Sequence, residues 1–137
     1  MRCLLLALPP AVLLAFGARA GDPPVTVKTL VATDKTVLGQ PLVLPKRDPE
    51  LIVSIYEIAP GARLPRHEHP FSRYAYVLAG ELTVEFDGGE QRRYKPGDVI
   101  VEAVGAWHFG INAGAVPVRL LVIDQVEKGQ PATVLAK

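Results

Sequence analysis

The stretch of the chain that decides the fold is residues 61–80, which read GARLPRHEHPFSRYAYVLAG. It holds two of the three histidines of the chain, in the order His67-Glu68-His69. On an extended strand, residues two apart point to the same face, and their backbones lie about 7 Å apart. Both imidazoles can therefore reach one cation at the usual distance of about 2.0–2.1 Å. Together with His108, which opens a later run, they predict a metal site.

The spacing of these histidines and of the glycines around them resembles the cupin family. The family's first motif is a Gly, five residues, His-x-His and a second Gly further on, and its second motif places His and Asn after two further glycines. The matching positions are Gly61, His67, His69 and Gly80, then Gly97, Gly105, His108 and Asn112, with Ala103 where Pro is usual. The resemblance covers residues 50–126 and implies an all-β fold, the cupin double-stranded β-helix or jelly-roll barrel, with the histidines inside its mouth.

The chain departs from the family pattern at Arg73, which stands where a cupin usually has a fourth metal ligand, a Glu. A guanidinium about 5 Å from a cation is repelled by roughly 1.7 kcal/mol per unit of metal charge at a dielectric of about 40. Arg73 must therefore turn away, find an anion or weaken the metal. Two roles are open to it: a clamp for a substrate carboxylate or phosphate, or a surface arginine paired with Glu57 or Glu102.

Two neighbours of the histidines are further candidates. Trp107 precedes His108 and could form the wall of a substrate site, although a single Trp at a barrel rim also serves packing. Glu68 lies between the first two histidines and is expected to face away from them.

Short apolar runs separated by turn residues predict the rest of the fold, and no interval has a helical period of helical length. The runs are residues 25–32, 36–44, 51–59, 73–79, 82–86, 91–94, 99–103, 108–111 and 118–126. Residues 82–86 alternate strictly, and Asp87-Gly88-Gly89 then predicts a tight hairpin. Residues 51–58 and 118–126 are apolar on both faces, as in a sandwich or against a second subunit, so a homodimer is plausible. Residues 127–137 are interpreted as a tail.

The ends and the charge of the chain suggest an exported domain. Residues 1–20 have the charged start, apolar stretch and small-x-small end of a signal peptide, so residues 21–137 would form one mature barrel domain. Without Arg2 and Arg19, 13 basic side chains face 14 acidic ones, a net charge of −1. This charge disfavours nucleic acid and, after signal cleavage, a membrane as partners. We expect a periplasmic or secreted bacterial protein.

Two functions of different class fit this sequence. The first is a metal-dependent enzyme, an oxygenase or a Lewis-acid isomerase or hydrolase. Its substrate would be a small organic molecule, and an anionic molecule is one candidate. The second is a non-catalytic barrel that binds or senses a small ligand or a metal. Three neutral imidazoles suit one divalent transition metal ion, and Fe, Zn, Cu, Ni and Mn are all candidates.

Overall fold

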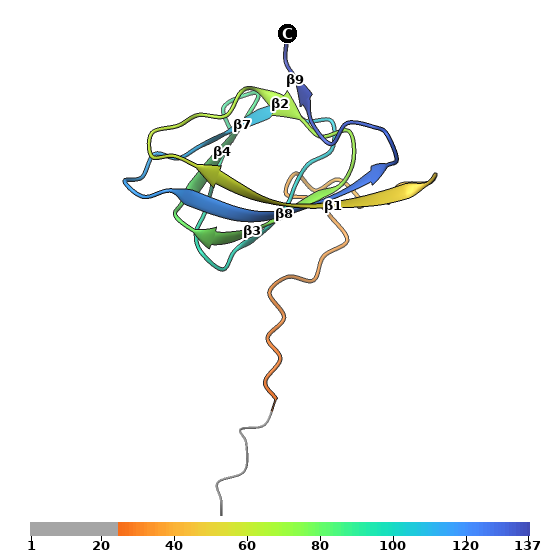
Figure 1. Ribbon diagram of the computed structural model, residues 1–137, viewed down its shortest axis with the longest axis horizontal. Helices are drawn as coiled ribbons and strands as arrows, with labels where there is room; N and C mark the ends of the chain where they lie inside the picture. Colours follow the sequence, from red (N-terminus) through yellow and green to blue (C-terminus); the bar gives the residue numbers. More distant parts are fainter. Residues whose placement is uncertain (1–24) are drawn as a thin grey trace, which may run out of the picture.

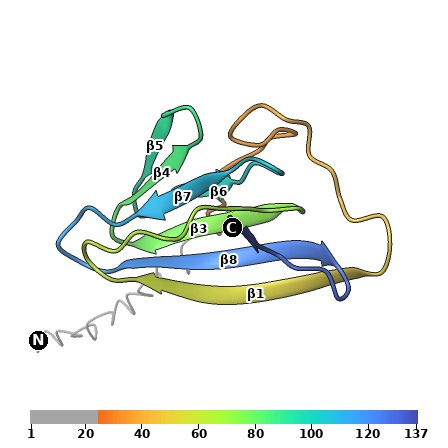
Figure 2. The same cartoon turned by 90° about the horizontal axis from the view of Figure 1, so that it is seen from above.

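The structure, a computed structural model, describes residues 25–137, and the predicted signal peptide lies outside these described residues. Two antiparallel sheets face each other, as the views from the front and from above show (Figures 1 and 2). The strands are β1 (Pro49–Ile58), β2 (His67–Glu68), β3 (Arg73–Ala79), β4 (Leu82–Phe86), β5 (Gln91–Tyr94), β6 (Val99–Val101), β7 (His108–Ile111), β8 (Val118–Glu127) and β9 (Val134–Leu135). The all-β prediction is therefore confirmed.

The order of strands places the histidines in one sheet and the longest strands in the other. One sheet runs β1-β8-β3-β6 and the second runs β5-β4-β7-β2-β9. Since β2 pairs with β7, the first two histidines come to lie beside His108 although about forty residues separate them in the sequence. Within the described part of the chain, no helix has the length and apolar character needed to cross a membrane.

The predicted hairpin is confirmed. Strands β4 and β5 pair from Leu82↔Tyr94 to Glu85↔Gln91. Gly88 and Gly89 connect them with φ values of 98° and 87°, in the left-handed region that favours glycine.

The core lies between the sheets and follows the period-two pattern of the strands. In β8 every second residue from Val118 to Val126 is buried. Strands β1, β3 and β6 of the same sheet add to this layer, and β4 of the second sheet faces it. The same alternation carries three charged side chains inward at the barrel mouth, namely Arg73 on β3, Asp124 on β8 and Glu102 just after β6.

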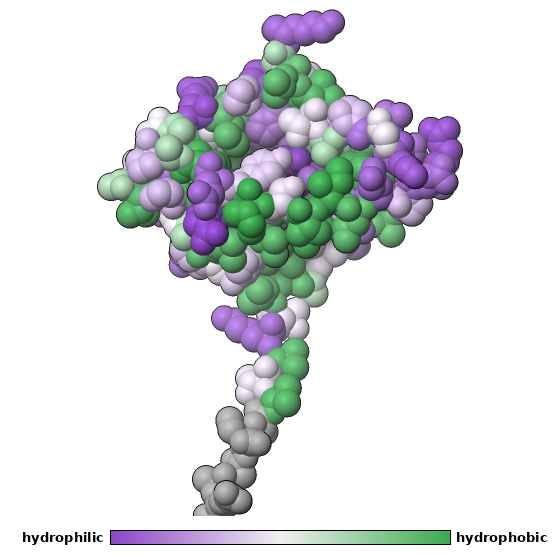
Figure 3. All heavy atoms as spheres, in the orientation of Figure 1, coloured by the Kyte–Doolittle hydropathy of each residue, from purple (hydrophilic) through white to green (hydrophobic). Residues whose placement is uncertain are grey.

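The outer face of the first sheet is apolar and open in the single chain. Leu51, Val53 and Ile55 of the edge strand β1 are 61%, 56% and 50% exposed, and their cross-strand neighbours Leu121 and Ile123 are half-buried. Figure 3 shows apolar side chains gathered along this face. The second sheet thus covers only the inner face of the β1-β8-β3-β6 sheet and leaves the outer apolar face open. The homodimer stays a prediction.

Three predicted segments differ in the structure. Residues 25–32 and 36–44 form no strand, and the bridge Lys35↔Pro41 is their one ladder contact. Gly39, with φ of 79°, turns the chain, and Pro41 and Pro45 lack the N–H that a ladder requires. The supposed tail, residues 127–137, instead continues β8 and then adds β9 to the edge of β2. A two-residue strand leaves no periodic pattern by which it could be predicted.

Candidate metal centre

The three histidines meet inside the barrel mouth, as the sequence predicted. His67 pairs with His108 across β2 and β7, and His69 follows directly after β2. The ring centroids lie 4.4–5.0 Å apart, and one nitrogen of each ring lies within 4.8 Å of the others. All three side chains are buried, with His69 completely so. The geometry is that of a cluster able to hold one metal ion.

Backbone carbonyls fix the orientation of all three rings. The Nδ1 atom of His67 donates to the carbonyl of Pro65 at 2.7 Å, and Nδ1 of His108 donates to that of Ala106 at 2.8 Å. The Nδ1 atom of His69 donates at 3.0 Å to a carbonyl of the C-terminal segment, at residue 132. A carbonyl only accepts, so each Nδ1 carries a proton. Each Nε2 is then left for the centre of the cluster, the arrangement seen around protein-bound metals.

Burial keeps His67 neutral. It lowers the pKa of His67 to about 4, because desolvation disfavours the charged imidazole more than the carbonyl of Pro65 and nearby Glu102 favour it. A neutral imidazole is the form that binds a metal.

The structure adds a carboxylate that the sequence did not place at the histidines. One oxygen of Glu102, Oε2, lies 3.2 Å from Nε2 of His69 and 3.2 Å from Nε2 of His108. Burial raises the pKa of Glu102, but hydrogen bonds from His108 and His69 outweigh it and hold this pKa well below the usual range. Burial lowers the pKa of His108, and the bond to Glu102 outweighs it and raises that pKa. The geometry thus places Oε2 of Glu102 and the two Nε2 atoms close enough to share a proton or a metal ion.

Arg73 finds its anion inside the barrel. The side chain is 4% exposed, so the expectation of a surface arginine paired with Glu57 or Glu102 was wrong. Its Nε donates to Asp124 Oδ1 at 2.6 Å and its Nη2 to Oδ2 at 3.2 Å, because β3 and β8 place the two residues opposite each other. This carboxylate already occupies the fork that a substrate clamp would need. The remaining Nη1 lies 3.4 Å from His69 Nε2.

The other two candidates are not members of the cluster. Glu68 is half-buried and is not part of the three-histidine group. The Trp107 ring lies under the guanidinium of Arg66, whose carbon is 4.6 Å from the ring centroid. Arg66 in turn pairs with Asp87 at the surface. The structure thus gives Trp107 a packing partner, and its substrate-binding role stays a prediction.

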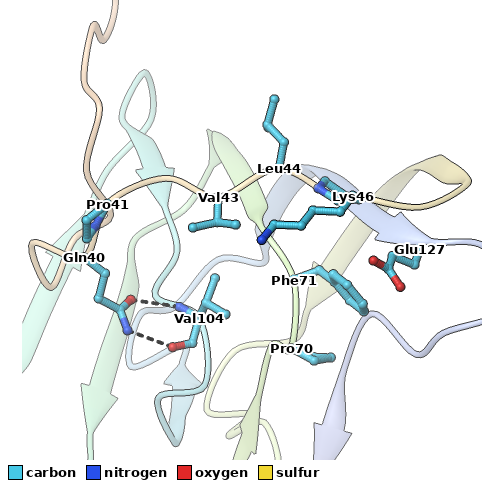
Figure 4. Close-up of a pocket in the computed structure, with 10 residues that line it drawn as sticks. Gln40, Pro41, Val43, Leu44, Lys46, Pro70, Phe71, Val104 and Glu127 are labelled. Carbon is cyan, nitrogen blue, oxygen red and sulfur yellow. Dashed lines mark hydrogen bonds between the residues drawn. The ribbon is translucent and has the colours of Figure 1, made fainter.

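Two cavities are relevant to ligands. A cavity of about 30 Å³ adjoins the cluster, room for about one water-sized ligand. Its walls are His67, His108, Glu102 and Arg73 together with Tyr56, Leu64, Leu82, Val84, Gly110, Leu120 and Val122. A larger cavity of about 490 Å³ lies between the segment 40–46 and residues 70–71 (Figure 4). The Gln40 side chain closes one end of it through two bonds to the backbone of Val104. None of its walls is a histidine.

Comparison with known proteins settles the family. The model of the cupin domain matches residues 54–124. The chain belongs to the cupin family. Germin-like protein 1 of Brassica napus is similar to this cupin, with 39% identity over 71 residues, which are 48% of this chain and 34% of that protein. The chain therefore spans about a third of the length of this curated relative.

Two solved structures share the fold. The DMSP lyase DddQ from Ruegeria pomeroyi DSS-3 has a TM-score of 0.55 and 28% identity, over 63% of this chain and 43% of that one. An oxalate oxidase has a TM-score of 0.52 and 26% identity, over 63% of this cupin and 46% of that chain.

Proposed function

We propose that this cupin is a metal-dependent enzyme that holds one divalent transition metal ion, Fe, Zn, Cu, Ni or Mn, with His67, His69 and His108. The observation that carries the proposal is that all three Nδ1 atoms donate to backbone carbonyls. Three Nε2 atoms therefore face one point in a buried place. Core histidines kept only for packing would need no such common orientation.

The charges of the site favour an anionic substrate. Three neutral imidazoles, Glu102 and a divalent ion sum to a net charge of about +1, because Asp124 neutralises Arg73. The metal would supply Lewis-acid or redox chemistry at its open positions. The protein's own part is to orient the ligands and to exclude water with the apolar walls formed by Leu64, Leu82 and Val122.

The size of the cavity and the names of the relatives support a reaction on a small molecule. A cavity of about 30 Å³ admits a very small reactant unless the apolar walls move. Two structural relatives are named for reactions on small molecules, an oxalate oxidase and a DMSP lyase, and oxalate is a small dicarboxylate. We therefore infer an oxygenase or a Lewis-acid isomerase or hydrolase that acts on a small carboxylate.

A second function, a non-catalytic barrel that binds or senses a metal or small ligand, is favoured by two observations. The cavity leaves little room for a substrate beside the metal, and the fork of Arg73 is occupied by Asp124.

Turnover distinguishes the two functions. Apo-protein is reloaded separately with each of the five metals and incubated with small mono- and dicarboxylates, while substrate loss is followed by NMR and oxygen uptake by an electrode. An enzyme consumes at least one compound with one metal, and the His108→Ala variant does not. Stoichiometric metal without turnover of any compound would favour the binding barrel.

We further propose that the protein is exported to the periplasm or secreted by a bacterium, and that it forms a homodimer through the open face of β1 and β8. The apolar start of the sequence supports the first proposal, and the exposed Leu51, Val53 and Ile55 support the second. Intact mass would show a mature chain that begins at Gly21, and light scattering would show twice the mass of one chain. An uncleaved or monomeric protein would contradict the respective proposal.

A further inference from the structure

Three charged side chains form a row across three neighbouring strands at the barrel mouth. Strand β3 lies between β8 and β6, and Arg73 pairs in register with Asp124 on β8. On its other side, the amide of Glu102 donates to the carbonyl of Arg73 at 2.9 Å. The row therefore reads carboxylate, guanidinium, carboxylate, and all three side chains point inward.

The two carboxylates of the row have different partners. Asp124 accepts hydrogen bonds from Nε and Nη2 of Arg73 at 2.6 and 3.2 Å, so its carboxylate neutralises the guanidinium. The Glu102 carboxylate turns to the histidines, with Oε2 at 3.2 Å from Nε2 of both His69 and His108. One negative charge of the row is thus left for the cluster.

The spacing at Glu102 fits atoms that bind one metal ion. Two ligand atoms that are each about 2.1 Å from a cation lie about 3.0 Å apart at a right angle and about 3.4 Å apart at the tetrahedral angle. Both measured separations, 3.2 Å, fall inside this range. The Nδ1 protons of both histidines are already donated to carbonyls, so electron-rich atoms meet at this point.

We propose that Glu102 is the fourth protein ligand of the metal, so that the carboxylate which cupins usually carry at the position of Arg73 is supplied here from the neighbouring strand. The inference rests on the proposed metal site and deepens it. Arg73 and Asp124 then form a neutral pair that joins β3 and β8 beside the ligands, with Nη1 of Arg73 3.4 Å from Nε2 of His69. The acidic ligand thus stands at Glu102 instead of at the position of Arg73. The metal still has one carboxylate ligand and the same negative charge beside it.

The test is the binding of Co²⁺, whose visible spectrum reports its ligands, measured in competition with a chromophoric chelator. We compare wild type, Glu102→Gln, and Glu68→Gln as the matched control, since Glu68 is acidic, near the cluster and outside it. Glu102→Gln should raise the Kd by at least about tenfold and shift the spectrum. Glu68→Gln should leave both unchanged.

Each outcome decides the question. Equal Kd and spectrum for wild type and a folded Glu102→Gln variant would overturn the role of Glu102 while leaving the three-histidine site intact. No Co²⁺ binding by wild type would overturn the site and this inference together. If Glu102→Gln does not fold by circular dichroism, Glu102→Asp replaces it, since the shorter carboxylate should weaken binding and shift the spectrum. An unchanged Kd and spectrum in that variant would likewise overturn the proposal.

Discussion

Replacing Asp124 by Asn should strongly destabilise the barrel. The side chains of Asp124 and Arg73 are each 5% exposed, and two hydrogen bonds join them. Asn keeps the volume but removes the charge, and Arg73 is then a buried cation beside the histidines. Removing one partner of a buried ion pair typically costs about 3–5 kcal/mol. We expect the lower end of this range, because Glu102 also attracts the guanidinium.

Urea unfolding of the metal-free protein measures this loss. With a urea m-value of about 1–3 kcal/mol/M, a loss of about 3 kcal/mol lowers the midpoint by roughly 1–3 M. The matched control is Glu57→Gln, which breaks the exposed pair with Arg119, whose side chains are 50% and 65% exposed. Such pairs contribute at most about 1 kcal/mol. The double variant Arg73→Met/Asp124→Leu should recover most of the stability, because it leaves no buried charge unpaired.

Equal midpoints for Asp124→Asn and Glu57→Gln would refute this reasoning. They would mean that Arg73 reaches solvent or another anion once Asp124 is gone, and that the row of charges does not organise the mouth.

Three further predictions concern the turns, the histidines and the C-terminal segment. Gly80→Ala should lower the melting temperature more than Gly97→Ala. Both glycines have positive φ, but only a Cβ at Gly80 would come within 2.7–2.9 Å of other atoms, those of Pro117 and Val118. Equal losses of stability would contradict this. In the metal-free protein, NMR should show His67 neutral down to about pH 4. The contribution of His67 to stability should fall as pH drops from about 6.5 towards 4, because the unfolded state binds the proton first. Titration of His67 near pH 6.5 would show that the ring is not desolvated. Truncation of residues 132–137 should raise the Kd for metal by about 10–100-fold, because His69 loses its carbonyl acceptor; an unchanged Kd would contradict that role.

Local patterns predicted the local features. The hairpin between β4 and β5 depends on neighbours in sequence, and strict alternation followed by Gly88 and Gly89 was enough to predict it. The first two histidines share a face for the same reason. The convergence of His108 with them followed from the family resemblance, because the sequence spacing alone does not say which strands pair.

The partners of the charged residues depend on strand pairing and were missed. Asp124 stands in phase with the buried Val122 and Val126 of β8, and Glu102 in phase with the buried Ile100 of β6. This period-two signal marks both as inward carboxylates. It does not show that β3 runs between β8 and β6, and without that neighbourhood Arg73 could not be matched to Asp124, nor Glu102 to the histidines.

The role of the C-terminal segment also could not be predicted from the sequence. Residues 127–137 contain no long apolar run, yet β9 pairs with β2, residue 132 orients His69 and Thr133 accepts a hydrogen bond from Arg73 at 3.0 Å. These contacts are made by single backbone and hydroxyl groups, which leave no pattern in composition.

Metal content tests the central claim most directly. The protein is purified without a histidine-rich tag and measured by elemental mass spectrometry beside a folded His108→Ala variant. We predict about one divalent transition metal ion per chain in wild type, after reloading if needed, and loss of that stoichiometric metal in the variant. Wild type that takes up none of Fe, Zn, Cu, Ni or Mn, or a variant that retains full metal, would contradict the three-histidine site.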